Sequence, residues 1–167
     1  TSTSEPSPPP PPAHPLPPRN PPPLPDAAPK PTKGGLEATV RFESDATNYA
    51  QRTGDLAPLK RVYDLTRCKV CASLAAQFEN LTSNGRYLVG ASYTVVSVSG
   101  ATVTPSEDGK FSGVIELSAK RDAGRQVEPD GRFIQEIEAD STSKFALALS
   151  FDGAWRILGS RVTEVGR

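Results

Sequence analysis

Two cysteines separated by two residues, Cys68 and Cys71, form the most distinctive chemical pattern in this sequence. A structural zinc ion takes four ligands, so the pair supplies only half of a zinc site. Arg67 and Lys69 would favour a thiolate and hence thiol–disulfide chemistry, but the pair does not follow a strand in a βαβ unit. We therefore favour a structural disulfide that joins two helices in an oxidising compartment.

Histidine-dependent chemistry is almost excluded by composition. His14 is the one histidine among the 167 residues, and it lies in a proline-rich segment. Ser-His-Asp and Cys-His machinery requires an imidazole beside the nucleophile, so the rest of the chain cannot build either. The sequence also lacks the glycine-rich phosphate-binding motifs G-x-G-x-x-G and G-x-x-x-x-G-K-[ST]. We assign no catalytic residues and expect no metal and no cofactor.

A carboxylate and a phenol in a pocket could still perform acid–base chemistry. Asp45, Asp64 and Glu43 lie on or near the expected helices, with Tyr49 and Tyr63 nearby in sequence. Carboxylates on helices are usually solvated surface groups. On this basis Asp45, Tyr49 and Tyr63 are the candidate pocket residues.

These residues must be positioned by a domain that begins after a proline-rich segment. Fifteen of the 18 prolines lie between Pro6 and Pro31, and residues 1–33 contain no Val, Ile, Phe, Tyr or Trp. Ordering each residue costs about 1–2 kcal/mol of backbone entropy, which this segment cannot offset by burial. We predict a disordered, extended stalk over 1–33 and one folded domain over 34–167.

Charge and hydropathy narrow the possible partners. The 19 Lys and Arg balance the 19 Asp and Glu, which argues against a nucleic-acid partner or a polybasic membrane surface. No apolar run approaches the ~18–20 residues of a membrane span. The sequence contains no Met and starts at Thr1, so we expect the original N-terminus and any signal peptide to lie upstream. The expected partner is a protein or a small-molecule ligand whose identity the sequence does not give.

The periodicity of apolar residues predicts three helices followed by strands. A spacing of three or four residues indicates helices over 36–52, about 55–65 and 68–84. After Gly85 the period changes to two, which predicts strands over 87–98, 111–119, 133–139, 145–151 and from 155 towards 162. The alternation changes parity at Val95-Val96, which indicates a bulge.

Three Asp-Gly pairs, at 108–109, 130–131 and 152–153, predict hairpin turns between these strands. We expect the last of them to form a two-residue type I′ turn. Helices followed by antiparallel strands predict an α+β fold.

The order of these features resembles a family of uncharacterised secreted lipoproteins of high-GC Gram-positive, actinobacterial-type bacteria. The resemblance covers roughly residues 34–165 and rests on Asn48-Tyr49-Ala50-x-x-Thr53-Gly54-Asp55, the Cys68-x-x-Cys71 pair and the closing Trp155. It implies a domain similar to the nuclear transport factor 2-like, cystatin-like cone, in which helices pack on a curved antiparallel sheet. It also implies a lipidated Cys upstream of Thr1 that anchors the stalk outside the cell membrane.

The leading functional prediction is a surface-anchored, extracytoplasmic, non-catalytic binding or accessory module whose concave sheet receives the partner. One alternative is a small-molecule isomerase or hydrolase that uses a pocket Tyr and Asp. Such an enzyme requires an enclosed apolar cavity of several hundred Å³. Another alternative is a thiol–disulfide protein that uses Cys68 and Cys71, which requires one accessible sulfur.

Overall fold

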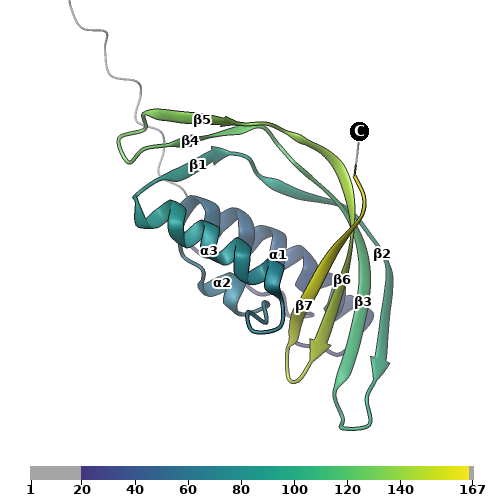
Figure 1. The fold of residues 1–167 in the computed structure, drawn as a ribbon. Coiled ribbons are helices and arrows are strands. Elements are labelled where there is room, and N and C mark those ends of the chain that lie inside the picture. The colour runs from purple at the N-terminus through teal and green to yellow at the C-terminus, as the bar shows by residue number, and fades with distance from the viewer. Residues whose placement is uncertain (1–19, 166–167) are drawn as a thin grey trace, which may run out of the picture.

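The computed structural model describes residues 20–165 of the chain (Figure 1). Three helices come first: α1 (Lys33–Thr53), α2 (Ala57–Lys60) and α3 (Lys69–Ser83). Seven strands follow: β1 (Tyr87–Gly90), β2 (Tyr93–Pro105), β3 (Phe111–Arg121), β4 (Gly124–Val127), β5 (Phe133–Ile137), β6 (Asp140–Phe151) and β7 (Trp155–Glu164). The predicted disorder of residues 1–19 concerns a part of the chain outside the described residues.

The strands form two antiparallel sheets that bend around one layer of helices. The small sheet has the order β1-β4-β5, and the large sheet has the order β2-β3-β6-β7. Figure 1 shows α1 and α3 side by side within the curve of the two sheets. The α+β prediction with helices packed on a curved antiparallel sheet is confirmed.

The helices begin and end where short-range signals place them. Thr32 caps α1 by accepting a hydrogen bond from Gly35 N at 3.1 Å, and Gly54 ends the helix with φ 74°. The second helix was predicted over about 55–65, but α2 covers only Ala57–Lys60. Its first amide, Ala57 N, donates to Asp55 Oδ1 at 2.9 Å.

The predicted strand over 87–98 is divided in two by a sharp turn of the backbone. Gly90 and Ala91 both have positive φ, at 74° and 53°. Gly124 passes so close that a Cβ on it would lie 2.3 Å from Ala91 N. The chain therefore leaves the small sheet after β1 and enters the large sheet at β2.

Further along β2, the predicted bulge is confirmed. The pairing of β2 with β3 shifts register between Val95 and Ser97. Val96 is consequently 54% exposed. Val95 and Val98 both pack against the core although they are three residues apart, which is what a change of parity predicts.

The Asp-Gly pairs all occupy turns, where Gly109, Gly131 and Gly153 have φ between 74° and 84°. They join β2 to β3, β4 to β5 and β6 to β7. The last turn is not the predicted two-residue type I′ turn. Phe151 pairs with Trp155, so three residues lie between the paired positions.

The predicted boundary at residue 33 is too late, because residues 24–32 pack on the domain. Leu24 lies against the hydrophobic core, and Ala28 is 3% exposed. Trp155 Nε1 donates a hydrogen bond of 2.8 Å to the carbonyl of Lys30. A buried indole N–H requires an acceptor, and here a proline-rich backbone provides it. We call residues 24–32 the N-terminal segment.

Replacing Gly113 with Ala tests how closely the large sheet packs on α1. A Cβ at Gly113 would lie 2.8 Å from the Trp155 ring and 2.9 Å from Leu36 Cδ1. Overpacking of this kind should lower the free energy of unfolding by about 1–3 kcal/mol. Gly159→Ala in β7 is the matched control, because its Cβ would have no neighbour within 4 Å. Equal urea midpoints for the two variants would contradict the packing described here.

Candidate functional site

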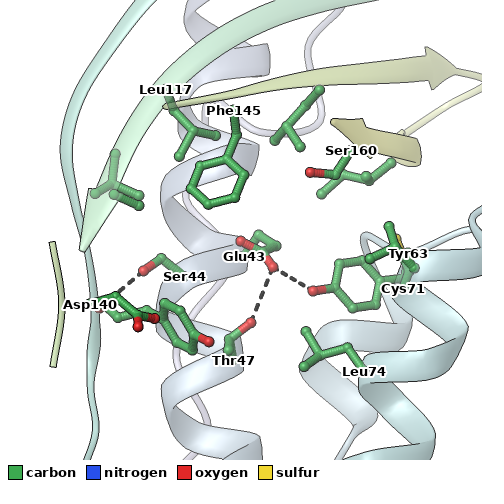
Figure 2. Close-up of a pocket in the computed structure, with 16 residues that line it drawn as sticks. Glu43, Ser44, Thr47, Tyr63, Cys71, Leu74, Leu117, Asp140, Phe145 and Ser160 are labelled. Carbon is green, nitrogen blue, oxygen red and sulfur yellow. Dashed lines mark hydrogen bonds between the residues drawn. The ribbon is translucent and has the colours of Figure 1, made fainter. Parts of the chain in front are cut away.

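A pocket of about 310 Å³ lies between α1, α3 and the concave face of the large sheet (Figure 2). Side chains from four strands and two helices form its walls. Most of the wall is apolar, and its larger members are Val70, Leu74, Val95, Leu117, Phe145, Leu147 and Ile157. A space of this size and polarity is typical of a site for a small molecule.

Each element supplies pocket residues through its own periodicity. Glu43 and Thr47 lie four residues apart on α1, so their side chains share one face of the helix. On α3, Cys71 and Leu74 are three residues apart and also share a face. Leu117 and Ala119 of β3, and Phe145 and Leu147 of β6, are spaced by two and point inward from the sheet.

Tyr63 reaches the pocket because the loop after α2 pairs with β7. Ile157 N donates to Val62 O at 2.7 Å, and Asp64 N donates to Ile157 O at 3.1 Å. These bonds form a short parallel bridge between Tyr63 and Ile157. The bridge fixes the backbone of Tyr63 beside the sheet and directs its phenol into the pocket.

The polar centre of the pocket is the carboxyl group of Glu43. Its Oε1 accepts one hydrogen bond from Thr47 Oγ1 at 3.1 Å and another from the Tyr63 hydroxyl. Figure 2 shows both bonds converging on one carboxyl oxygen, within the pocket lining. No residue among 20–165 donates a hydrogen bond to the other oxygen, Oε2, and none forms an ion pair with Glu43.

Burial controls the protonation of this pair. Desolvation raises the pKa of Glu43 above its ordinary value, although the hydrogen bonds from Tyr63 and Thr47 partly offset the increase. Burial, together with the charge of Glu43 and the hydrogen bond to it, raises the pKa of Tyr63 well above 10. Tyr63 therefore remains a hydrogen-bond donor at neutral pH, while Glu43 can exchange a proton or accept a further hydrogen bond at Oε2.

A second carboxyl, Asp140, lies at the sheet side of the pocket, but it already has a cationic partner. Its Oδ2 lies 3.0 Å from Arg121 Nη2, and the Arg121 guanidinium stands 5.9 Å from the centre of the Tyr93 ring. Tyr93 and Asp140 both line the pocket. The Arg121 charge is therefore balanced by Asp140 beside the pocket.

Of the three predicted pocket residues, the structure places only Tyr63 in the pocket. Asp45 is exposed on α1, because it lies two residues beyond Glu43 and so points to another side of the helix. Tyr49 is buried elsewhere, and its hydroxyl donates to Asp55 Oδ2 at 3.3 Å. The carboxyl group at the polar centre of the pocket belongs to Glu43, which was among the carboxylates considered but was not chosen as a candidate. Its place in the helical stripe of Leu36, Val40 and Thr47 was the signal that distinguished it from Asp45.

The predicted disulfide between Cys68 and Cys71 is confirmed, with the two Cα atoms 5.2 Å apart. Cys68 caps α3 by accepting a hydrogen bond from Cys71 N at 3.2 Å. The two residues are 1% and 4% exposed, and Cys71 lines the pocket. The disulfide thus fixes the first turn of α3 at one wall of the pocket.

Within residues 20–165, no group of three or more His, Cys, Asp and Glu side chains is arranged to hold a metal ion. The helices of this part of the chain are also too short or too polar to span a membrane.

Replacing both Cys68 and Cys71 with Ala should lower the free energy of unfolding by about 2 kcal/mol. That value follows from the loop entropy of so short a ring. Urea unfolding of the double variant and of the wild type, the latter with and without a reductant, measures the free energies of unfolding to be compared. The unreduced protein should also have a mass lower than the reduced form by roughly two hydrogens. Two thiols that react freely with an alkylating agent in the folded, unreduced protein would contradict the assignment.

Replacing Glu43 with Gln should remove a pH dependence of stability. The folded pKa of Glu43 is raised above 4.5, whereas the unfolded chain keeps the ordinary value. Between these two values the folded state binds more protons, so the free energy of unfolding falls as the pH rises. Glu43→Gln should therefore be more stable than the wild type above the folded pKa, and the difference should vanish below about pH 4.

Urea unfolding between about pH 4 and 8 measures this dependence. Asp45→Asn is the matched control, because it removes a carboxylate from the exposed side of the same helix and should keep the wild-type dependence. A Glu43→Gln variant whose pH dependence equals that of the wild type would show that Glu43 is not the responsible group.

The solved structures that are similar to this chain include two that cover most of it. One is the intermembrane space region of the chloroplast protein ARC6, with a TM-score of 0.51, 15% identity, and coverage of 81% of this chain and 98% of that one. The other is a nuclear transport factor 2-like superfamily protein from Salmonella enterica serovar Typhimurium, with a TM-score of 0.51, 12% identity, and coverage of 81% and 92%. The second likeness confirms the expected nuclear transport factor 2-like fold.

Comparison of the whole sequence with curated proteins yields no match. Residues 12–161, by contrast, match a protein family that is described as a family of unknown function, DUF6318. That match includes both the Asn48-Tyr49-Ala50 motif and the cysteine pair. The chain therefore belongs to the DUF6318 family.

Proposed function

We propose that this protein is an extracytoplasmic binding module that holds a small, mainly apolar molecule in the pocket between the helices and the large sheet. The observation that carries the proposal is a space of about 310 Å³ with largely apolar walls and one carboxyl oxygen that has no hydrogen-bond donor among residues 20–165. Apolar walls supply affinity, and a few polar groups inside them fix the orientation of a ligand.

The residues of the pocket favour binding over the two alternatives. The pocket has the size that an isomerase or hydrolase requires, but the predicted Asp45 lies outside it on the exposed side of α1, and the Asp in its lining, Asp140, is paired with Arg121. Thiol–disulfide exchange requires an accessible sulfur, whereas Cys68 and Cys71 are both buried. Of the chemistry-bearing residues in the lining, the Glu43–Tyr63 pair is the part best suited to hold a ligand.

The disulfide supports placement outside the cytoplasm, because cytosolic thiols are kept reduced. Attachment to the membrane through a lipidated Cys upstream of Thr1 is part of the same proposal and rests on the resemblance to secreted lipoproteins. Recovery of the protein from its own cells with both thiols free would argue against this placement.

Binding of a neutral, environment-sensitive dye such as prodan tests the proposed pocket. Dye fluorescence should rise and shift to shorter wavelength on addition of the wild-type protein. Val95→Phe places extra bulk in the pocket wall and should weaken binding by about tenfold or more, which corresponds to about 1.4 kcal/mol.

Val96→Phe is the matched control. Val96 is the adjacent residue of the same strand, is 54% exposed and does not belong to the described lining. Its variant should bind the dye within about twofold of the wild type, since it leaves the pocket contacts unchanged. Failure of the folded wild type to bind the dye, or equal weakening in both variants, would contradict the proposal.

A further inference from the structure

The pocket carries negative charge without a matching cation in its lining. Glu43 and Asp140 are its two carboxyl residues, and the described lining contains no Lys, Arg or His. Arg121, beside the pocket, balances Asp140 at 3.0 Å. Glu43 has no such partner among residues 20–165, so this part of the chain leaves its carboxylate charge uncompensated.

An uncompensated carboxylate in an apolar cavity is costly. Removing an ionised carboxyl from water is unfavourable unless a cation or several hydrogen bonds replace the lost hydration. Thr47 and Tyr63 provide two hydrogen bonds, but both go to Oε1. Oε2 retains its lone pairs, and a cationic donor within the pocket would satisfy both the charge and this oxygen.

The remaining lining of the pocket also suits a cation with a hydrocarbon body. The rings of Tyr93 and Phe145 belong to the wall, and aromatic faces attract cations through their quadrupoles. Figure 2 shows Phe145 and Leu117 on the sheet side of Glu43, with Leu74 on the helix side. The hydroxyl oxygens of Thr47 and Tyr63 donate their hydrogens to Glu43 but keep lone pairs that an ammonium group can use.

We propose that the ligand class is an apolar organic ammonium ion, whose charged nitrogen binds Oε2 of Glu43 and whose hydrocarbon part fills the pocket. This inference rests on the proposed binding function and specifies its ligand chemistry. A carboxylate of the same shape would meet the like charge of Glu43. A neutral alcohol could donate one hydrogen bond to Oε2 but would leave the charge uncompensated.

Three ligands with one hydrocarbon skeleton separate these cases: 1-naphthylmethylamine, 1-naphthalenemethanol and 1-naphthoic acid. Displacement of prodan from the wild-type protein at neutral pH gives their relative affinities. We expect the amine to bind at least about tenfold more tightly than the alcohol, because a hydrogen bond between charged groups is stronger than one with a neutral donor. The acid should bind most weakly.

Glu43→Gln identifies the responsible group, because it keeps the shape of the side chain and removes the charge. The amine and the alcohol should then bind within about threefold of one another. Asp45→Asn, which removes a carboxylate from the exposed side of the same helix, should retain the wild-type preference for the amine.

The possible failures are distinguishable. A wild-type protein that binds prodan but prefers the alcohol or the acid to the amine would overturn the ammonium inference and leave the binding function intact. A folded wild type that binds neither prodan nor any of the three compounds would overturn both. A Glu43→Gln variant that keeps the amine preference would exclude Glu43 as its source. The wild-type comparison decides the ligand class even if that variant does not fold.

Discussion

The amide group of Asn48 binds both the N–H and the carbonyl of Tyr93, and this contact holds the start of β2 against α1. Asn48 Nδ2 donates to Tyr93 O at 2.7 Å, and Asn48 Oδ1 accepts from Tyr93 N at 2.7 Å. Gln51, one turn later on α1, donates to Ala91 O at 3.1 Å. The helix thus satisfies backbone groups that would otherwise be unpaired where β1 ends and β2 begins. Without these bonds Tyr93 N would lose its acceptor and Ala91 O its donor on α1.

The break between the two sheets is related to where the large sheet packs directly on α1 and where the pocket separates them. At one end of α1, Leu36 and Trp155 approach Gly113 so closely that the sheet and helix are in direct contact. Two turns further along α1, at Glu43, the sheet has moved away and the pocket occupies the space between them. The anchoring of Tyr93 to α1 limits the separation beyond this point. The pocket is therefore a consequence of sheet curvature held at two places along one helix.

The sequence was sufficient for the features that local periodicity determines. The helices, most strands, the bulge beside Val95 and the antiparallel α+β class all follow from spacing or turn residues. The break at Ala91 did not, because a positive φ there is maintained by Gln51, 40 residues away. Strand β4, Gly124–Val127, has little apolar character and is defined by its pairing with β1 and β5. Packing of the N-terminal segment depends on Trp155, which is 125 residues from Lys30 in sequence.

The bond between Trp155 and the Lys30 carbonyl also determines how the domain is joined to whatever precedes it. This bond, the burial of Ala28 and the packing of Leu24 hold the N-terminal segment on the domain, with Lys30 beside the start of β7. A flexible joint at the beginning of α1 would let the pocket opening face any direction. The attached segment instead moves the point of departure to the residues before Leu24, and tension applied there would act on the contacts of Leu24 and Ala28 before it reached the indole bond.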